Sequence, residues 1–292
     1  MTITLEVPDT VEETLEILGN GDETVRPVAG GSGLALMMRY GFFVPTTLVS
    51  LHRLTGELSG VSSTPEGGLR IGATTTLRDV EYAPQVREGV PVLHQALRRL
   101  ATIRLRNVAQ IGGAIAHGAP QMDLPPVLIA LDATVRVQSR RGERSIAADD
   151  IFLGYYETGV ESDELVMDLV LPPLGDHRGT YRKITARSID DWPLLGIAAV
   201  ARFVAGAMTQ VRVGIGALGD HAQRVPSVEA LSGSDPTLDD IREAAEVAAD
   251  GLDYHEGGMA SPAYQRQIVA THLRRALEDV VLGTPERIGR QV

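Results

Sequence analysis

The chain has 292 residues, with 27 lysines and arginines against 38 aspartates and glutamates, which gives a formal net charge of −11. This acidity disfavours nucleic acid as a partner, because its phosphates attract basic surfaces. The chain contains no cysteine, which excludes disulfides, thiolate catalysis and cysteine-ligated iron–sulfur clusters on it. No membrane-spanning stretch or signal peptide is recognisable, so a cytoplasmic protein of about two domains is expected.

Hydrophobic spacing and glycine boundaries define the predicted elements of the first half. Thr10 is expected to cap a helix, and a strand at 25–29 is expected to be buried. Asp123 is expected at the N-terminal end of a helix, where an acidic residue also suits the cap. We predict helices over 11–19, 34–38, 77–82, 92–100 and 124–131, and strands over 25–29, 47–51, 68–73 and 134–138.

A segment rich in proline and glycine, 172–179, predicts a link to a second domain. Beyond it the pattern changes to longer strands followed by two strong helices. We predict antiparallel strands over 181–186, 196–203 and 210–216, a helix capped by Thr237 that ends at Gly251, and a helix over 263–281.

Three motifs are interpreted as structural. The glycines 214, 216 and 219 have the G-x-G-x-x-G spacing, but no helix pattern follows them, so we expect a strand end rather than a dinucleotide site. Ser32 lacks the glycine that a nucleophile elbow needs two residues later, because position 34 is leucine. The seven histidines show no metal-ligand spacing.

Two glycine pairs, Gly30-Gly31 and Gly112-Gly113, lie where small residues flank a turn. Glycine permits positive φ and close approach of the backbone to a ligand, and bare amides in such turns bind anions. Either pair alone is equally consistent with a tight turn. Together they indicate two loops that grip one phosphate-bearing ligand.

Segments 29–34, 103–117 and 123–125 resemble the FAD-binding medium subunits of molybdenum hydroxylases, the family of the carbon monoxide dehydrogenase flavoprotein and the xanthine dehydrogenase FAD domain. The resemblance extends over nearly the whole chain, through 152–158, 164–172, 181–183, 214–217 and 264–277. It implies an α+β fold. Residues 1–175 would form a two-lobed FAD-binding domain of the vanillyl-alcohol-oxidase (PCMH) type, with lobes at about 1–56 and 57–175. Residues 176–292 would form a C-terminal domain with an antiparallel sheet and helices.

The same resemblance implies where FAD binds. The turn from Ala29 to Gly33 and the segment Ile111-Gly112-Gly113 would hold the pyrophosphate, Asp123 would contact the cofactor, and Trp192 would lie beside the isoalloxazine. The expected cofactor-binding residues are Ala29, Gly30, Gly31, Ser32, Gly33, Leu34, Ile111, Gly112, Gly113, Ala116, His117, Asp123, Val166, Lys183 and Trp192. Ala114 stands where the family often has Asn or Asp, and no histidine matches a covalent attachment site, so FAD should be noncovalent.

The function implied is electron transfer through FAD, without a catalytic side chain or a metal on this chain. A large molybdopterin-binding subunit and a small [2Fe-2S] subunit would be the partners, in a dimer of heterotrimers. Two alternatives remain: a stand-alone FAD-dependent oxidoreductase with its own substrate site, and a binding module that has lost its flavin. The resemblance leaves the oxidised substrate and the electron acceptor open.

Overall fold

The computed structural model describes residues 3–254 and 260–283, which fold into two compact units. The first unit comprises Met1–Gly89, Leu100–Pro120 and Asp132–Pro173. The second comprises Val90–Arg99, Gln121–Leu131 and Leu174–Val292. Two segments from the first half of the chain therefore pack within the second unit, and the predicted domain boundary near residue 175 stays a prediction.

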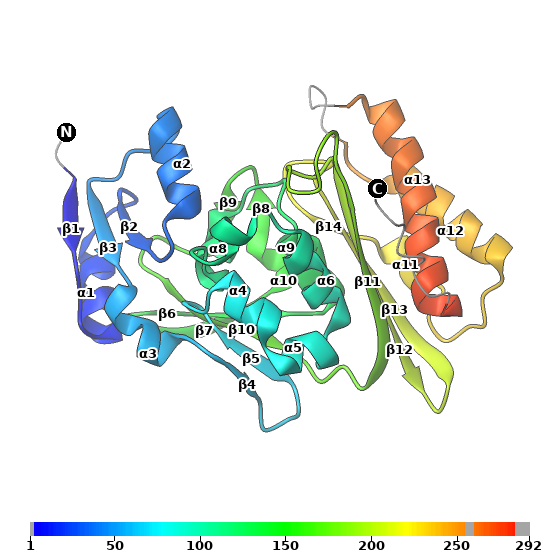
Figure 1. Cartoon of the computed structure of the whole chain (residues 1–292), viewed down its shortest axis with the longest axis horizontal. Helices are drawn as coiled ribbons and strands as arrows, with labels where there is room; N and C mark the ends of the chain where they lie inside the picture. Colours follow the sequence, from blue (N-terminus) through cyan, green and yellow to red (C-terminus); the bar gives the residue numbers. More distant parts are fainter. Residues whose placement is uncertain (1–2, 255–259, 284–292) are drawn as a thin grey trace. The chain divides into compact units, whose positions relative to one another are not determined.

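A three-stranded parallel sheet of order β1-β3-β2 begins the first unit (Figure 1). Its elements are β1 (Thr4–Glu6), α1 (Val11–Asn20), β2 (Val25–Val28), α2 (Ser32–Tyr40) and β3 (Thr47–Ser50). The Thr10 side chain accepts a hydrogen bond from the Glu13 amide and caps α1, as predicted. The apolar stripe of α1 packs against Val49 of β3 in a small core. The strand predicted as buried at 25–29 is only half-buried, because β2 is an edge strand of this sheet.

The larger sheet of the first unit is antiparallel, with order β4-β5-β10-β6-β7. Its strands are β4 (Val61–Ser63), β5 (Leu69–Gly72), β6 (Thr134–Ser139), β7 (Gly142–Ala147) and β10 (Leu165–Leu171). The remaining elements of this unit are η1 (His52–Leu54), α3 (Thr55–Leu58), α4 (Leu77–Tyr82), α5 (Pro84–Gly89), α7 (Ile103–Arg106), α8 (Ile111–His117), α10 (Ala148–Ile151), β8 (Phe152–Gly154) and β9 (Glu157–Thr158).

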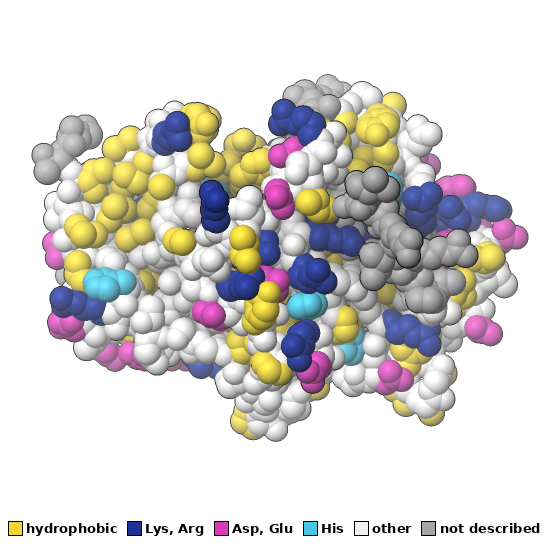
Figure 2. All heavy atoms as spheres, in the orientation of Figure 1, with side chains coloured by type: hydrophobic (Ala, Val, Ile, Leu, Met, Phe, Trp, Pro, Cys, Tyr) yellow, Lys and Arg dark blue, Asp and Glu magenta, His cyan; other side chains and the backbone are white. Residues whose placement is uncertain are grey.

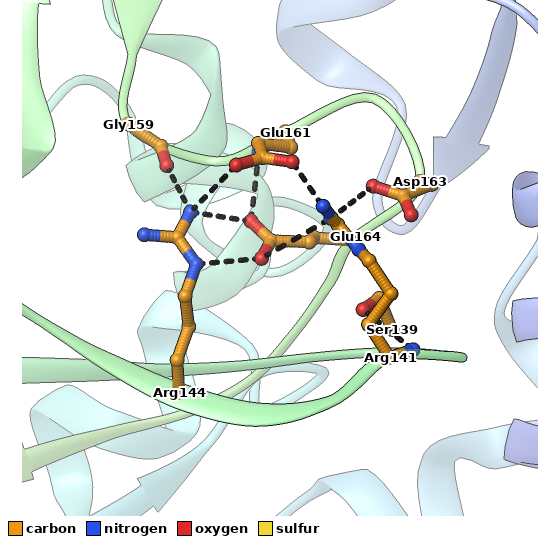
Figure 3. Close-up of polar contacts among 7 residues, drawn as sticks. All are labelled: Ser139, Arg141, Arg144, Gly159, Glu161, Asp163 and Glu164. Atoms are coloured by element: carbon orange, nitrogen blue, oxygen red, sulfur yellow. Dashed lines mark hydrogen bonds and ion pairs between the residues drawn. The ribbon is translucent and has the colours of Figure 1, made fainter.

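A cluster of ion pairs fixes the segment that leads into β10 (Figure 3). Arg144 of β7 binds both carboxylate oxygens of Glu164, at 2.6 and 2.7 Å, and donates to the Gly159 carbonyl at 2.7 Å. Arg141 binds Glu161 and Asp163 at 2.7 and 2.8 Å. These bonds tie residues 159–164 to the β6–β7 hairpin, directly before β10 begins between β5 and β6.

The second unit is built on an antiparallel sheet of order β11-β12-β13-β14. Its elements are α6 (Pro91–Arg99), α9 (Leu124–Ala130), β11 (Asp176–Ile184), β12 (Leu195–Val204), β13 (Ala207–Gly216), β14 (Gln223–Arg224), α11 (Pro226–Glu229), α12 (Leu238–Gly251), α13 (Pro262–Leu277) and the π-helical turn η2 (Glu278–Leu282). The link predicted at 172–179 is shorter than expected, because β11 already begins at Asp176.

Helices cover both faces of this sheet. Alternate residues of β12 and β13, such as Ile197 and Val213, pack with α12 and α13 in one core. On the other face, α9 packs on β12 and β13, and a Cβ on Gly214 would lie 2.1 Å from the Pro126 carbonyl oxygen. The first two glycines of the motif at 214–219 therefore lie at the end of strand β13, where the lack of a side chain leaves room for α9 to pack. This confirms the structural interpretation of the motif.

Large apolar side chains are exposed on the first unit around α2. Tyr40 and Phe42 are 64% and 79% exposed, and Leu36 and Val44 are exposed beside them. Figure 2 shows hydrophobic side chains gathered over this part of the chain. Contiguous apolar surface of this kind is typical of protein–protein contacts. Among the described residues, no helix is long and apolar enough to cross a membrane.

Asp168 is fully buried in β10, where it pairs with two arginines of neighbouring strands. It accepts hydrogen bonds from Arg70 Nε at 2.6 Å and Arg136 Nε at 2.7 Å. Burial alone would raise the pKa of Asp168, but the hydrogen bonds from Arg136 and Arg70 outweigh it, and the pKa is lowered.

We expect Asp168→Asn to lower the free energy of unfolding at neutral pH by about 1–3 kcal/mol, because it removes charge-assisted hydrogen bonds. A lowered carboxyl pKa stabilises the fold above the unfolded pKa, and this stabilisation is lost as the pH falls through the folded value. Urea unfolding should therefore show that the unmodified chain loses more stability than the variant between about pH 5 and pH 3. Asp239→Asn, in an exposed ion pair on α12, is the matched control. Equal acid sensitivity of the unmodified chain and Asp168→Asn would contradict this role.

Candidate functional site

The first glycine pair lies in the turn between β2 and α2. Gly31 is the N-cap of α2 and has φ +68°, in the left-handed region that side chains rarely adopt. Any substitution of Gly31 is therefore strained even without a ligand. Ser32, Gly33 and Leu34 form the first turn of α2, and all three are half-buried.

The turn packs directly against the segment that leads into α8. A Cβ on Gly30 would lie 1.9 Å from the Val108 carbonyl oxygen, and a Cβ on Gly33 would lie 3.0 Å from the His117 ring. A Cβ on Gly113 would meet only Ala29, at an ordinary 3.6 Å. The structure thus brings together the two glycine loops that the sequence singled out.

Both loops present backbone amides without partners. Among the described residues, no side chain caps α2, and the amides of Ser32, Gly33 and Leu34 make no hydrogen bond. In α8 the amides of Ile111 and Gly112 bind the carbonyls of Thr75 and Ala73, while the exposed Gly113 has no such partner among these residues. Helix N-termini with free amides attract anions. This arrangement suits a phosphate group.

Polar and aromatic groups surround these loops. The Oε1 atom of Gln110, the N-cap of α8, is buried without a hydrogen-bond partner within the described part of the chain. His117 packs edge-on against Tyr156, whose φ is +58°. Burial lowers the pKa of His117, which favours the neutral ring. Ala116 is exposed on α8, and Ile111 is buried at its start. The sequence reasoning did not select Gln110 or Tyr156.

Asp123 and Lys183 meet in the core of the second unit. The Lys183 ammonium lies 3.1 Å from Asp123 Oδ2 and donates to the Arg99 carbonyl at 2.8 Å. The Tyr181 hydroxyl donates to Asp123 Oδ1 at 2.6 Å. Burial raises the pKa of Asp123, while Lys183, Tyr181 and Arg99 act in the opposite direction. Tyr181 was not predicted as a site residue, although its two-residue spacing from Lys183 on one strand places both side chains on the same face.

The prediction that Asp123 lies at the N-terminal end of a helix is confirmed, but the capping role that it could have there is not observed. Asp123 occupies the N-cap position, yet its side chain makes no capping hydrogen bond. A capping side chain bonds the amide of the second or third helical residue, and these residues are Pro125 and Pro126, which have no N–H. The carboxylate is therefore left for other partners.

The last two predicted residues lie in different settings. Val166 is buried in β10, 7% exposed, in the first unit. Trp192 is 47% exposed in the loop between β11 and β12 of the second unit, so the expected loop is confirmed. Their contact with a cofactor stays a prediction. Within residues 3–254 and 260–283, no group of three potential metal ligands is present.

Two family models match the chain. The FAD binding domain in molybdopterin dehydrogenase matches residues 1–174, and the CO dehydrogenase flavoprotein C-terminal domain matches residues 180–280. The glyceraldehyde dehydrogenase medium chain of Sulfolobus acidocaldarius is 30% identical, over 93% of this chain and 96% of that protein. The nicotine 6-hydroxylase medium subunit of Paenarthrobacter nicotinovorans is 31% identical, over 92% and 94%.

Solved structures agree with these sequence relatives. A chain of carbon monoxide dehydrogenase from Hydrogenophaga pseudoflava matches with a TM-score of 0.91 and 28% identity, and the match covers 97% of this chain and 98% of that one. The expected α+β architecture, a FAD-binding domain followed by a domain with an antiparallel sheet and helices, is confirmed.

Replacing a glycine by alanine should change the stability of the cofactor-free fold differently in the two loops. We expect Gly30→Ala to lower the free energy of unfolding of the cofactor-free chain by about 1–3 kcal/mol or more, because the new Cβ meets backbone atoms. Gly113→Ala should leave it unchanged or slightly raised, since the added Cβ has room and alanine favours a helix. Thermal unfolding followed by circular dichroism measures both. A Gly113→Ala variant as unstable as Gly30→Ala would contradict the packing described above.

Proposed function

Because the chain belongs to the family of FAD-binding medium subunits of molybdenum hydroxylases, which are oxidoreductases, we propose that it passes electrons from a partner subunit to an external acceptor. The partners are a small subunit with [2Fe-2S] clusters and a large subunit with the molybdenum cofactor, in a dimer of heterotrimers in the cytoplasm. Bound FAD supplies the electron-accepting and electron-donating chemistry. The absence of cysteine fits this division, because the clusters need ligands that this chain lacks.

The observation that carries the proposal is the pair of adjoining loops with free amides. Helix α2 presents the amides of residues 32–34, and α8 adds that of Gly113. These N–H donors match the acceptor oxygens of a pyrophosphate. Asp123, Lys183, Val166 and Trp192 are proposed as further contacts of the cofactor, which binds without a covalent bond.

The protein's own contribution is to bind and orient the cofactor. The turns hold its anionic part through backbone amides, whose positions the fold fixes before binding. The Asp123 carboxylate has acceptor capacity beyond its two observed hydrogen bonds and can take a donor of the cofactor. Exposed apolar side chains around α2, including Tyr40 and Phe42, support a chain that packs against other subunits.

Flavin binding and partner capture test the proposal directly. The full chain should bind FAD and show the flavin absorbance band near ~450 nm. Gly113→Ala, which the cofactor-free fold tolerates, should weaken FAD binding at least about tenfold, or about 1.4 kcal/mol. A tagged chain purified from its own host should bring two further chains with it. A folded chain that takes up no FAD would overturn the proposal. A flavoprotein that purifies alone and oxidises a substrate of its own would favour the stand-alone oxidoreductase instead.

Trp192 gives an independent optical test, since it is the only tryptophan. If the ring lies beside the isoalloxazine, its fluorescence should be strongly quenched when FAD binds and should recover when FAD is removed. Trp192→Phe identifies the tryptophan emission, and circular dichroism shows that the chain stays folded. Equal emission with and without bound FAD would place Trp192 away from the flavin.

A further inference from the structure

The hydroxyl of Tyr181 is the most deeply buried polar group next to Asp123. Tyr181 is 0% exposed, and its hydroxyl donates to Asp123 Oδ1 at 2.6 Å. Its backbone is also tied down, because its amide donates to Gln95 Oε1 at 2.8 Å and its carbonyl accepts from Arg99 at 2.7 Å. The ring therefore has a fixed place in the core, and the hydroxyl points at one carboxylate oxygen.

The neighbouring strand leaves room for this hydroxyl. Gly196 of β12 pairs with Lys183 of β11, and a Cβ on Gly196 would lie 2.8 Å from the Tyr181 hydroxyl oxygen. A side chain at position 196 would thus displace the hydroxyl from Asp123. Pro125 and Pro126 remove the amides that would otherwise attract the carboxylate towards α9. Within the described residues, the side-chain hydrogen bonds of Asp123 are those from Tyr181 and Lys183.

We propose that Tyr181 is a positioning residue for the flavin site, which holds the Asp123 carboxylate ionised and oriented for the cofactor. This rests on the proposed function, in that Asp123 must contact FAD. Tyr181 itself touches Asp123 and acts through it. A hydrogen bond to the ionised carboxylate stabilises that form, whereas burial opposes it. The charged and titratable groups that act on Asp123 are Lys183 and Tyr181 of β11 and Arg99 of α6.

Loss of the Tyr181 hydroxyl should raise the pKa of Asp123 further. At any given pH a larger share of the carboxyl is then protonated, and the protonated form lacks the negative charge and part of the acceptor capacity. FAD binding should weaken as the pH falls through the pKa of Asp123. Without the Tyr181 hydroxyl, this loss of affinity should occur at a higher pH. A flavin whose ring contacts Asp123 should also become easier to reduce, since the carboxyl then carries less of the negative charge that opposes reduction.

The test is FAD titration of the full chain across about pH 5 to 9, with Tyr181→Phe and Asp123→Asn alone and together. We expect Tyr181→Phe to weaken FAD binding about tenfold near pH 7, to move the pH dependence upwards and to shift the flavin potential to more positive values. Within the Asp123→Asn background, Tyr181→Phe should have no further effect. Tyr254→Phe is the matched control, because its hydroxyl donates to the Ala249 carbonyl elsewhere in the same unit.

Gly196→Ala is a second test of the hydrogen bond between Tyr181 and Asp123, because the added Cβ displaces the hydroxyl while the tyrosine stays in place. It should weaken FAD binding in the same direction, which keeps the proposal testable if Tyr181→Phe does not fold. Unchanged affinity, pH profile and potential in folded Tyr181→Phe would overturn the positioning role, as would an equal effect with and without Asp123. Failure of the unmodified chain to bind FAD would instead overturn the proposed function.

Discussion

The close approach of Gly30 to the Val108 carbonyl is the constraint on which the proposed cofactor site depends. With a Cβ only 1.9 Å from that oxygen, no residue other than glycine fits without moving the backbone. This contact brings the start of α2 next to the start of α8. The amides of residues 32–34 and of Gly113, which have no partner within the described part of the chain, therefore lie in neighbouring turns that the fold itself holds, so binding does not have to order them.

The sequence was sufficient for the local part of this arrangement. The glycine pairs predicted the turn before α2, and the hydrophobic spacing predicted α2 and the strands of the second unit. Each of these elements depends mainly on residues close by in the sequence. Burial of 25–29 was predicted wrongly, because burial depends on sheet order. β2 lies at an edge, and its partner β3 is some twenty residues away along the chain. No local pattern shows that order.

The network around Asp123 also has a part that the local sequence predicts and a part that only the tertiary structure shows. Pro125 and Pro126 already indicate that Asp123 cannot cap its helix, and the spacing of Tyr181 and Lys183 already places them on one strand face. What the sequence could not supply is the packing of α9 on β12 and β13, which brings Asp123 next to Tyr181, more than fifty residues later in the chain. The resemblance singled out Asp123, and its contact with the cofactor stays a prediction, whereas its partners Tyr181 and Lys183 required the structure.

The energetics of that network support the proposed contact of Asp123 with the cofactor. Asp123 and Lys183 are both almost fully buried, and a buried ion pair contributes little net stability, because removal from water offsets the attraction of the charges. Apolar side chains of similar volume would serve the core of the second unit as well or better. Tyr181 and Lys183 between them leave part of the hydrogen-bonding capacity of Asp123 unused. The proposed contact with the cofactor would give this costly buried carboxylate, which cannot cap its helix and is held by the Tyr181 hydroxyl, a polar ligand that completes its hydrogen bonds.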